Sequence, residues 1–286
     1  MSGPTEVVLL GTGSADGWPN AFCRCDSCEA ARAAGVVRSP TSVLVDGRIL
    51  LDLGPHVEAS ATRAGTHLAD LAAVLVTHVH EDHCAPAALL HRTWATDEPL
   101  VVHGPPAVVA ACTPWLDPAG SPITLREVTA GDDLEVAGYR VRVLPATHEA
   151  FGPAVLYDVT TPAEARLLYA TDTGPLTPEA FAAIRGSRFD LVLLEETFGH
   201  RPAGPGHHDL TSFGTTVADL RDIGALTDDG RVVAIHLSHH NPPPAQLAEA
   251  LAAHDAIAPP DGTHLTVPGR PPRPDRAATG DGPTTA

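Results

Sequence analysis

One segment, residues 78–83 (His-Val-His-Glu-Asp-His), constrains this chain more than any other, and it directly follows an apolar, strand-like run. Imidazole nitrogens and carboxylate oxygens are the ligands that divalent transition metals take in proteins. Because a strand presents alternate residues on one side, His78 and His80 can share one metal ion. Asp82 and His83 come after the chain turns and can reach a second ion nearby. The alternative is a polar surface loop, which the rarity of histidine and the preceding apolar run disfavour.

Two metal ions need more ligands than this segment supplies. Three later residues follow apolar, strand-like runs of their own, namely His148, Asp172 and His236. Taken singly, each has an ordinary explanation, because lone histidines are mostly polar residues with a partner and an aspartate in Thr-Asp-Thr-Gly often makes a turn. Their repeated position at the ends of apolar runs makes all three candidate metal ligands.

Apolar strands and helices alternate along most of the chain. Asp46-Gly47 predicts a tight turn within a hairpin at 42–51, and Ala137-Gly138 predicts a second hairpin at 134–144. Further strands are expected at 6–10, 73–77, 154–159, 166–170, 191–194 and 232–237, and helices at 56–64, 86–95, 177–185, 210–223 and 244–253. This pattern suits sheets packed together with helices outside.

The pattern at residues 78–83, H-x-H-x-D-H, resembles that of the metallo-β-lactamase superfamily, and His148, Asp172 and His236 match the family's further ligands in order. The resemblance covers about residues 6–267. It implies an α/β fold, an αββα sandwich of two mixed β-sheets with helices on the outer faces and the site at one edge. It also implies two divalent ions, one held by His78, His80 and His148, the other by Asp82, His83 and His236, with Asp172 bridging them.

The segment 21–34 contains a second group of metal-binding residue types, Cys23, Cys25 and Cys28, with the spacing C-x-C-x₂-C. Three thiolates this close can share one zinc ion, which needs a fourth ligand and is then structural because no position is left for substrate. Three ordinary reduced cysteines in a loop are the alternative. The chain has five cysteines, and an odd number with three crowded together favours metal binding over disulfides. The other two, Cys84 and Cys112, match no motif and are interpreted as buried thiols.

Residues 10–17 (Leu-Gly-Thr-Gly-Ser-Ala-Asp-Gly), followed by the three cysteines and by Ala-Ala-Arg at 30–32, resemble the phosphoribosyl 1,2-cyclic phosphate phosphodiesterases of the carbon–phosphorus lyase pathway. In that branch, a histidine three residues after the last active-site ligand completes the structural zinc site. Here that residue is His239, and its neighbour His240 is a weaker candidate. The cysteine loop also resembles pyrroloquinoline quinone biosynthesis protein B, a relative with a degraded active-site motif.

The same branch carries a catalytic histidine before an Asp-Leu pair. His207 is in register with it, and His208 remains an alternative. The chain departs from the branch at His56, where an aspartate is common, and at Arg38, which is all that remains of a basic pair.

Charge and the lack of apolar segments narrow the classes of partner. The net charge of −17, from 18 Lys+Arg against 35 Asp+Glu, argues against a nucleic-acid polymer and against anionic membranes. No apolar run reaches the roughly 18–20 residues of a membrane helix, and the first residues lack a signal-peptide pattern. We therefore expect a cytoplasmic protein with one domain at 1–267 and a disordered tail at 268–286, which is rich in Pro, Gly and Thr. A homodimer is possible only because it is the commonest oligomer among soluble proteins, and no feature of the sequence supports it.

These features predict a metal-dependent hydrolase that acts on a phosphate ester, with a small cyclic phosphodiester of ribose as one candidate substrate. Two zinc or manganese ions, with iron also open, would lower the pKa of a bridging water so that hydroxide forms near neutral pH. Asp82 would orient that hydroxide or take its proton, and His207 would protonate the leaving oxygen. The alternatives are a hydrolase of lactones, thioesters or β-lactams on the same scaffold, a tRNA-processing nuclease, and a non-hydrolytic biosynthetic or binding protein.

Overall fold

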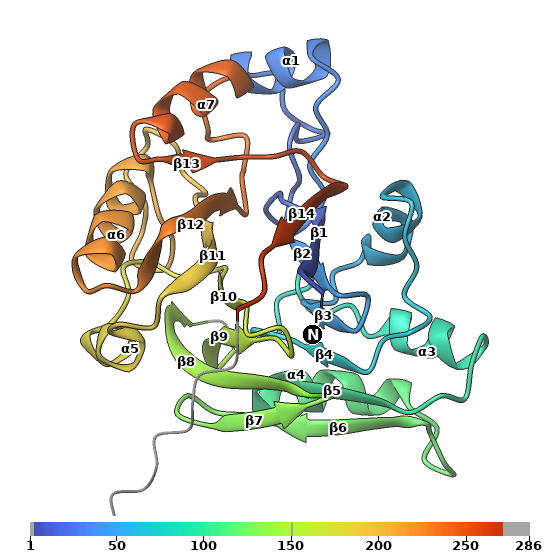
Figure 1. Ribbon diagram of the computed structural model, residues 1–286. Helices are drawn as coiled ribbons and strands as arrows, with labels where there is room; N and C mark the ends of the chain where they lie inside the picture. The colour runs from blue at the N-terminus through green and yellow to red at the C-terminus, as the bar shows by residue number, and fades with distance from the viewer. Residues whose placement is uncertain (1–2, 150, 271–286) are drawn as a thin grey trace, which may run out of the picture.

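The computed structural model describes residues 3–149 and 151–270, which form two seven-stranded sheets packed face to face (Figure 1). The first sheet has the spatial order β14 (Thr263–Val267), β1 (Thr5–Gly11), β2 (Ser42–Val45), β3 (Ile49–Leu51), β4 (Ala73–Leu75), β5 (Leu100–Gly104) and β6 (Ile123–Glu127). The second has the order β13 (Ala256–Ile257), β12 (Leu226–Ile235), β11 (Phe189–Glu195), β10 (Arg166–Ala170), β9 (Pro153–Thr160), β8 (Tyr139–Glu149) and β7 (Asp133–Val136). Both sheets mix parallel and antiparallel pairs.

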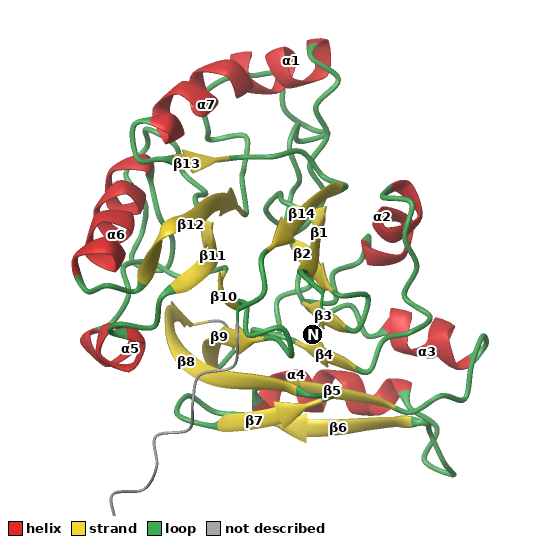
Figure 2. Ribbon diagram, in the orientation of Figure 1, coloured by secondary structure: helices red, strands yellow, loops and turns green. Residues whose placement is uncertain are grey.

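Helices cover the outer faces of both sheets (Figure 2). Those packed on the first sheet are α2 (Val57–Arg63), α3 (Ala87–Thr93) and α4 (Pro106–Cys112), with the short 3₁₀ turn η1 (Thr113–Trp115) after α4. Those packed on the second sheet are α1 (Asp26–Ala33), α5 (Pro178–Ile184), α6 (Leu210–Asp222) and α7 (Pro244–Ala252). The αββα sandwich expected from the sequence is confirmed.

Strand alternation explains why the strands read as continuous apolar runs. In β1, Val7 and Leu9 face the core between the sheets, whereas Val8 and Leu10 face the helices on the outside. All four side chains are almost fully buried. A strand covered on both faces needs apolar residues at every position rather than at alternate ones.

The two sheets are joined by hydrogen bonds close to the histidine-rich segment. The hydroxyl of Tyr157, in β9, donates to the carbonyl of Val76 at 2.7 Å. The backbone N–H of Val155 donates to the carbonyl of Thr77 at 3.0 Å. Residues 76 and 77 were expected to continue β4. The N–H of Val76 still donates to the carbonyl of His103 in β5 of the first sheet, at 2.8 Å, while the carbonyl groups of residues 76 and 77 accept from the second sheet, directly before His78.

Both predicted hairpins are confirmed, and their turns have the backbone conformation that the sequence suggested. Asp46 and Gly47 have φ of 51° and 66°, and Ala137 and Gly138 have φ of 53° and 87°. Positive φ at both central residues gives a two-residue turn the twist of its flanking strands. The sequence analysis assigned no residue ranges to six further elements, namely α1, α4, β5, β6, β13 and β14.

The end of the described chain packs on the body of the protein. Arg270 donates its backbone N–H to the carbonyl of Ala163 at 2.8 Å, and its guanidinium contacts Asp190. Residues 271–286, most of the predicted tail, lie outside the described residues. No helix within residues 3–149 and 151–270 has the length and hydrophobicity needed to cross a bilayer.

We predict that Tyr157→Phe lowers the free energy of unfolding by about 1–3 kcal/mol, because the buried Val76 carbonyl loses its partner. Urea unfolding followed by circular dichroism measures the change. Tyr139→Phe is the matched control, since its hydroxyl bonds to the more accessible carboxyl of Asp46 at 2.8 Å. Equal losses in the two variants would contradict a special role for the bond between the sheets.

Candidate metal centre

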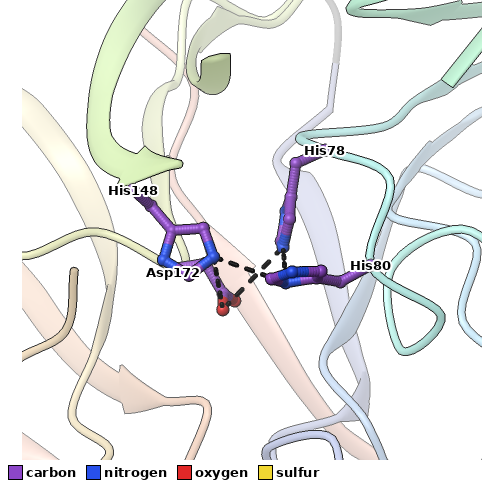
Figure 3. A group of neighbouring side chains, drawn as sticks. All are labelled: His78, His80, His148 and Asp172. Atoms are coloured by element: carbon purple, nitrogen blue, oxygen red, sulfur yellow. Dashed lines mark hydrogen bonds and ion pairs between the residues drawn. The ribbon is translucent and has the colours of Figure 1, made fainter. Parts of the chain in front are cut away.

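Side chains from both sheets converge at the edge where strands β4, β8 and β10 end. Figure 3 shows His78, His80, His148 and Asp172 pointing toward one another from three segments, with the first two on the same one. The Nε2 atom of His78 lies 2.9 Å from Nδ1 of His80, and Nε2 of His148 lies 3.4 Å from the same Nδ1. The Oδ1 atom of Asp172 lies 3.9 Å from Nε2 of both His78 and His148.

A second group lies against the other oxygen of Asp172. Its Oδ2 atom is 2.8 Å from Nε2 of His83 and 3.1 Å from Nε2 of His236. Asp82 completes the group, with Oδ2 at 2.9 Å from Nε2 of His83 and 3.4 Å from Nε2 of His236. The structure therefore brings together all seven residues that the sequence singled out, with the two oxygens of Asp172 facing different groups.

The chemistry of these groups fits divalent metal ions. Nε2 of His83 is buried without a hydrogen-bond partner although two carboxyl groups lie within 3 Å of it. Burial, reinforced by the neighbouring His83, holds the pKa of His78 well below its ordinary value, which favours the neutral imidazole that binds metals. Burial alone would raise the pKa of Asp172, but His236 and His83 hold it well below the ordinary value. Burial alone would lower the pKa of His83, but the carboxyl groups of Asp172, Asp52 and Asp82 raise it well above its ordinary value, so this group favours a positive charge at its centre. A divalent cation supplies that charge.

Asp52 orients two of these histidines from behind. Its Oδ2 atom lies 2.7 Å from Nδ1 of His83, and its Oδ1 atom accepts from the hydroxyl of Thr77 at 3.0 Å. The Thr77 oxygen lies 3.0 Å from Nδ1 of His78, so His78 reaches the same carboxyl group through the threonine. Such partners fix the tautomer and leave Nε2 free for a metal.

Glu195, the last residue of β11, plays the corresponding part in the second sheet. Its Oε1 atom lies 3.0 Å from Nδ1 of His207. Its Oε2 atom accepts from the hydroxyl of Thr197 at 2.6 Å, and the Thr197 oxygen lies 2.9 Å from Nδ1 of His236. The side chain is fully buried, which raises the pKa of Glu195 well above its ordinary value.

Sequence reasoning missed both Asp52 and Glu195. The predicted hairpin at 42–51 ends directly before Asp52, and Glu195 follows the strand predicted at 191–194. The available signal was an acidic residue at the end of an apolar strand, Leu-Leu-Asp for Asp52 and Leu-Leu-Glu for Glu195. Charged side chains at such positions are buried only when they have partners.

The two neighbouring histidines of the loop before α6 occupy different surroundings. The ring of His207 stacks on that of His236 at 5.6 Å between centroids and lies 5.0 Å from the ring of His148. His208 is fully buried, with Nδ1 3.1 Å from the hydroxyl of Ser212, and burial lowers its pKa to about 4. Only His207 lies beside the converging side chains.

Three residues of the centre have strained backbones. Asp52, Asp172 and His236 have φ of 62°, 47° and 56°. This left-handed region costs a residue with a side chain about 1–3 kcal/mol and persists only where the surroundings impose it. Each of these residues directly follows a strand or lies two positions beyond one, so the strain turns the side chain into the centre.

The cysteine group also converges. The sulfurs of Cys23, Cys25 and Cys28 lie within 4.8 Å of one another, and burial raises the pKa of Cys28 to about 12. His239 is adjacent, since its carbonyl oxygen lies 3.8 Å from Sγ of Cys25, but its Nδ1 lies 2.8 Å from Asp16 and its ring is not part of the group. A carboxyl group on one ring nitrogen is the usual support for a histidine ligand that binds through the other.

The remaining predicted residues have other contacts. His240 lies with Nδ1 2.7 Å from the guanidinium of Arg201. Cys84 and Cys112 are buried free thiols, as expected, with their sulfurs 3.9 Å apart. Arg38 is buried and donates to the carbonyl groups of Ala258 and Pro259, so it is part of the packing. His56 precedes α2 and is exposed.

We predict that Asp52→Asn weakens zinc binding at the centre about 10–100-fold, because His83 and His78 lose the group that orients them. Competition with a chelator at neutral pH measures the affinity, and circular dichroism checks the fold. Asp46→Asn, in the turn of the first hairpin, removes the same charge away from the centre and should leave the affinity unchanged. An unaltered affinity in Asp52→Asn would show that Asp52 does not orient the ligands.

Comparisons with known proteins agree with this geometry. The family model described as "Beta-lactamase superfamily domain" matches residues 47–237, a range that contains all seven residues of the two His/Asp groups but not the cysteine group. The chain is 30% identical over 275 residues to ribonuclease Z from Mycobacterium sp. (strain KMS), which covers 86% of this chain and 87% of that protein.

Two solved structures share the fold. A diphosphatase from the PhnP family has a TM-score of 0.71 and 21% identity, covering 91% of this chain and 97% of its own. Zn²⁺-bound PqqB from Methylobacterium extorquens has a TM-score of 0.73 and 22% identity, covering 91% and 99%. With the family match and the paired His/Asp groups, the chain belongs to the beta-lactamase superfamily and is a hydrolase of the metallo-β-lactamase fold.

Proposed function

We propose that this hydrolase is a phosphodiesterase that uses two divalent metal ions, zinc or manganese, to cleave a small phosphodiester. The observation that carries the proposal is the position of Asp172, whose two oxygens face two separate groups of nitrogen and oxygen atoms. Two ions sharing one carboxylate suit a phosphate, because they can contact the attacking and the leaving oxygen together.

The proposed ligands are His78, His80 and His148 for one ion, Asp82, His83 and His236 for the other, and Asp172 for both. When bound, the ions supply a water of lowered pKa and neutralise charge on the phosphate. The side chain of Asp82 is more accessible than that of Asp172, with exposed fractions of 8% and 3%. Asp82 therefore orients the attacking water or accepts its proton. Burial would raise the pKa of Asp82, but His83 and His236 hold it low, so the group accepts hydrogen bonds at neutral pH.

His207 is the proposed donor of a proton to the leaving oxygen. Glu195 accepts from Nδ1 of His207 at 3.0 Å, which leaves Nε2 to face the substrate. The side chain is 23% exposed, so it can reach both the substrate and solvent for reprotonation. His208 has no such position, because its ring is buried against α6.

The relatives, the net charge and the cysteine group support a small substrate that contains a phosphate ester. The relatives named ribonuclease Z and diphosphatase both break bonds to phosphorus, which supports a phosphate ester over a lactone or thioester. A net charge of −17 repels a long polyanion more than a small one. The cysteine group supports the small-molecule branch, with a structural zinc held by Cys23, Cys25, Cys28 and His239 as part of this proposal.

A second candidate function is RNA processing. It is favoured by one observation, the 30% identity to a mycobacterial ribonuclease Z over most of both chains. The same centre could cleave either substrate, because the bond that breaks is a phosphodiester in both. Cleavage of a precursor tRNA, measured beside that of the small substrate, separates the two candidates.

We predict that metal-loaded protein opens 5-phosphoribosyl 1,2-cyclic phosphate to a monoester, followed by ³¹P NMR. Asp82→Ala should abolish the reaction, because one ion loses a ligand and the attacking water loses its acceptor. Metal content and circular dichroism establish that the variant is folded. Full turnover by Asp82→Ala would disprove the mechanism, and cleavage of RNA without ring opening would favour the second candidate.

We further predict that His207→Gln lowers kcat about 10²–10⁴-fold while metal content stays the same, since proton donation contributes that much. His208→Gln is the matched control, being the same substitution one position along the chain, and should retain kcat if the protein folds. A larger loss of kcat in folded His208→Gln than in His207→Gln would reverse the assignment.

A further inference from the structure

A cavity of about 310 Å³ lies on the outer side of the first sheet, beneath α2 and α3. Figure 1 places these helices on the outer side of β3 and β4. The walls of the cavity are mostly aliphatic and include Leu53, Val57, Leu68, Val74 and Leu89. None of the residues that line it belongs to the proposed metal centre or to the cysteine group.

One residue that lines this aliphatic cavity, Arg92, carries a charged side chain. Arg92, in the last turn of α3, has all three guanidinium nitrogens buried, and none of them has a hydrogen-bond partner among the described residues. Burying a charged group without a partner is unfavourable, so such groups normally have one. Burial also lowers the pKa of Arg92, although Glu98 opposes this effect through its charge.

None of the nearby carboxyl groups in the described part of the chain forms a hydrogen bond with Arg92. Glu98 acts on it only through its charge. Glu58 lies 3.1 Å from Nδ1 of His91, and both side chains are about half exposed. These two groups therefore pair with each other at the mouth of the cavity. The guanidinium of Arg92 is left as the one buried cation among the residues that line this cavity.

We propose that this cavity binds a small amphiphilic carboxylate, with its hydrocarbon chain against the leucine and valine side chains and its carboxylate on Arg92, whose guanidinium is closed off from water and turns into the cavity when the ligand binds. A guanidinium binds a planar carboxylate through two parallel hydrogen bonds. Moving a hydrocarbon chain out of water and against the aliphatic walls is favourable. The volume is near the lower end of the roughly 300–1,000 Å³ of ligand pockets, which favours a short, unbranched chain. This inference does not depend on the proposed phosphodiesterase activity.

Isothermal titration calorimetry of the full-length protein with sodium octanoate tests the proposal. We expect saturable binding of octanoate, with 1-octanol bound about tenfold more weakly because it cannot pair with the guanidinium. Octylamine, which carries the opposite charge on the same chain, should not bind. Equal affinities for octanoate and octanol, or no saturable binding of octanoate, would overturn the proposal.

Three variants locate the site. Arg92→Met keeps the length and apolar stem of the side chain and should weaken octanoate binding about tenfold while leaving octanol unaffected. Ala88→Phe fills the cavity and should reduce binding of both. Arg126→Met removes an equal charge from an exposed position on β6 and should change neither. Octanoate binding by folded Arg92→Met at the wild-type affinity would place the ligand elsewhere and refute the assignment.

Discussion

Side chains from both sheets meet at the carboxyl group of Asp172, and this meeting determines how the sheets can pack. The first sheet delivers His78, His80, Asp82 and His83 from one segment, and the second delivers His148, Asp172 and His236 from three strands. The pairing of Tyr157 and Val155 with residues 76–77 fixes the distance between the sheets directly beside that segment. A shift of either sheet would separate the nitrogens from the carboxylate oxygens, so the packing of the core and the geometry of the centre are one constraint.

Each sheet also carries one buried carboxyl group that performs the same task. Asp52 contacts His83 directly and His78 through Thr77, whereas Glu195 contacts His207 directly and His236 through Thr197. In both cases the threonine hydroxyl donates to the carboxyl group and its oxygen is left to accept from the imidazole. Each acid thereby orients two imidazole rings, and several donors satisfy the oxygens of each buried carboxyl group. These hydrogen bonds account for the burial of both carboxyl groups.

The sequence predicts the centre better than the contacts that support it. Histidines and aspartates at the ends of apolar runs are visible by residue type and position alone, and strand ends of a sandwich meet at one edge. Asp52 and Glu195 have the same position, but their role depends on a threonine two or more residues away and on which ring faces them. Arg92 is a still harder case, because a helical arginine ordinarily points into solvent. Its guanidinium nitrogens are buried among residues from several elements that are far apart in sequence, which no local pattern encodes.

The acidic character of the protein is compatible with the proposed phosphate substrate, because the net charge of the whole surface and the charge of the metal centre act over different distances. At physiological ionic strength a charge is felt over roughly 8 Å, so a small anion near the centre responds to the groups within that range. Two divalent ions against the carboxylates of Asp82, Asp172 and Asp52, with neutral histidine ligands, would leave a local excess of about one positive charge. A long polyanion cannot bind only there, since its remaining phosphates lie over a surface where acidic residues outnumber basic ones, 35 to 18. The proposed preference for a small phosphodiester would therefore rest on repulsion outside the centre rather than on contacts inside it.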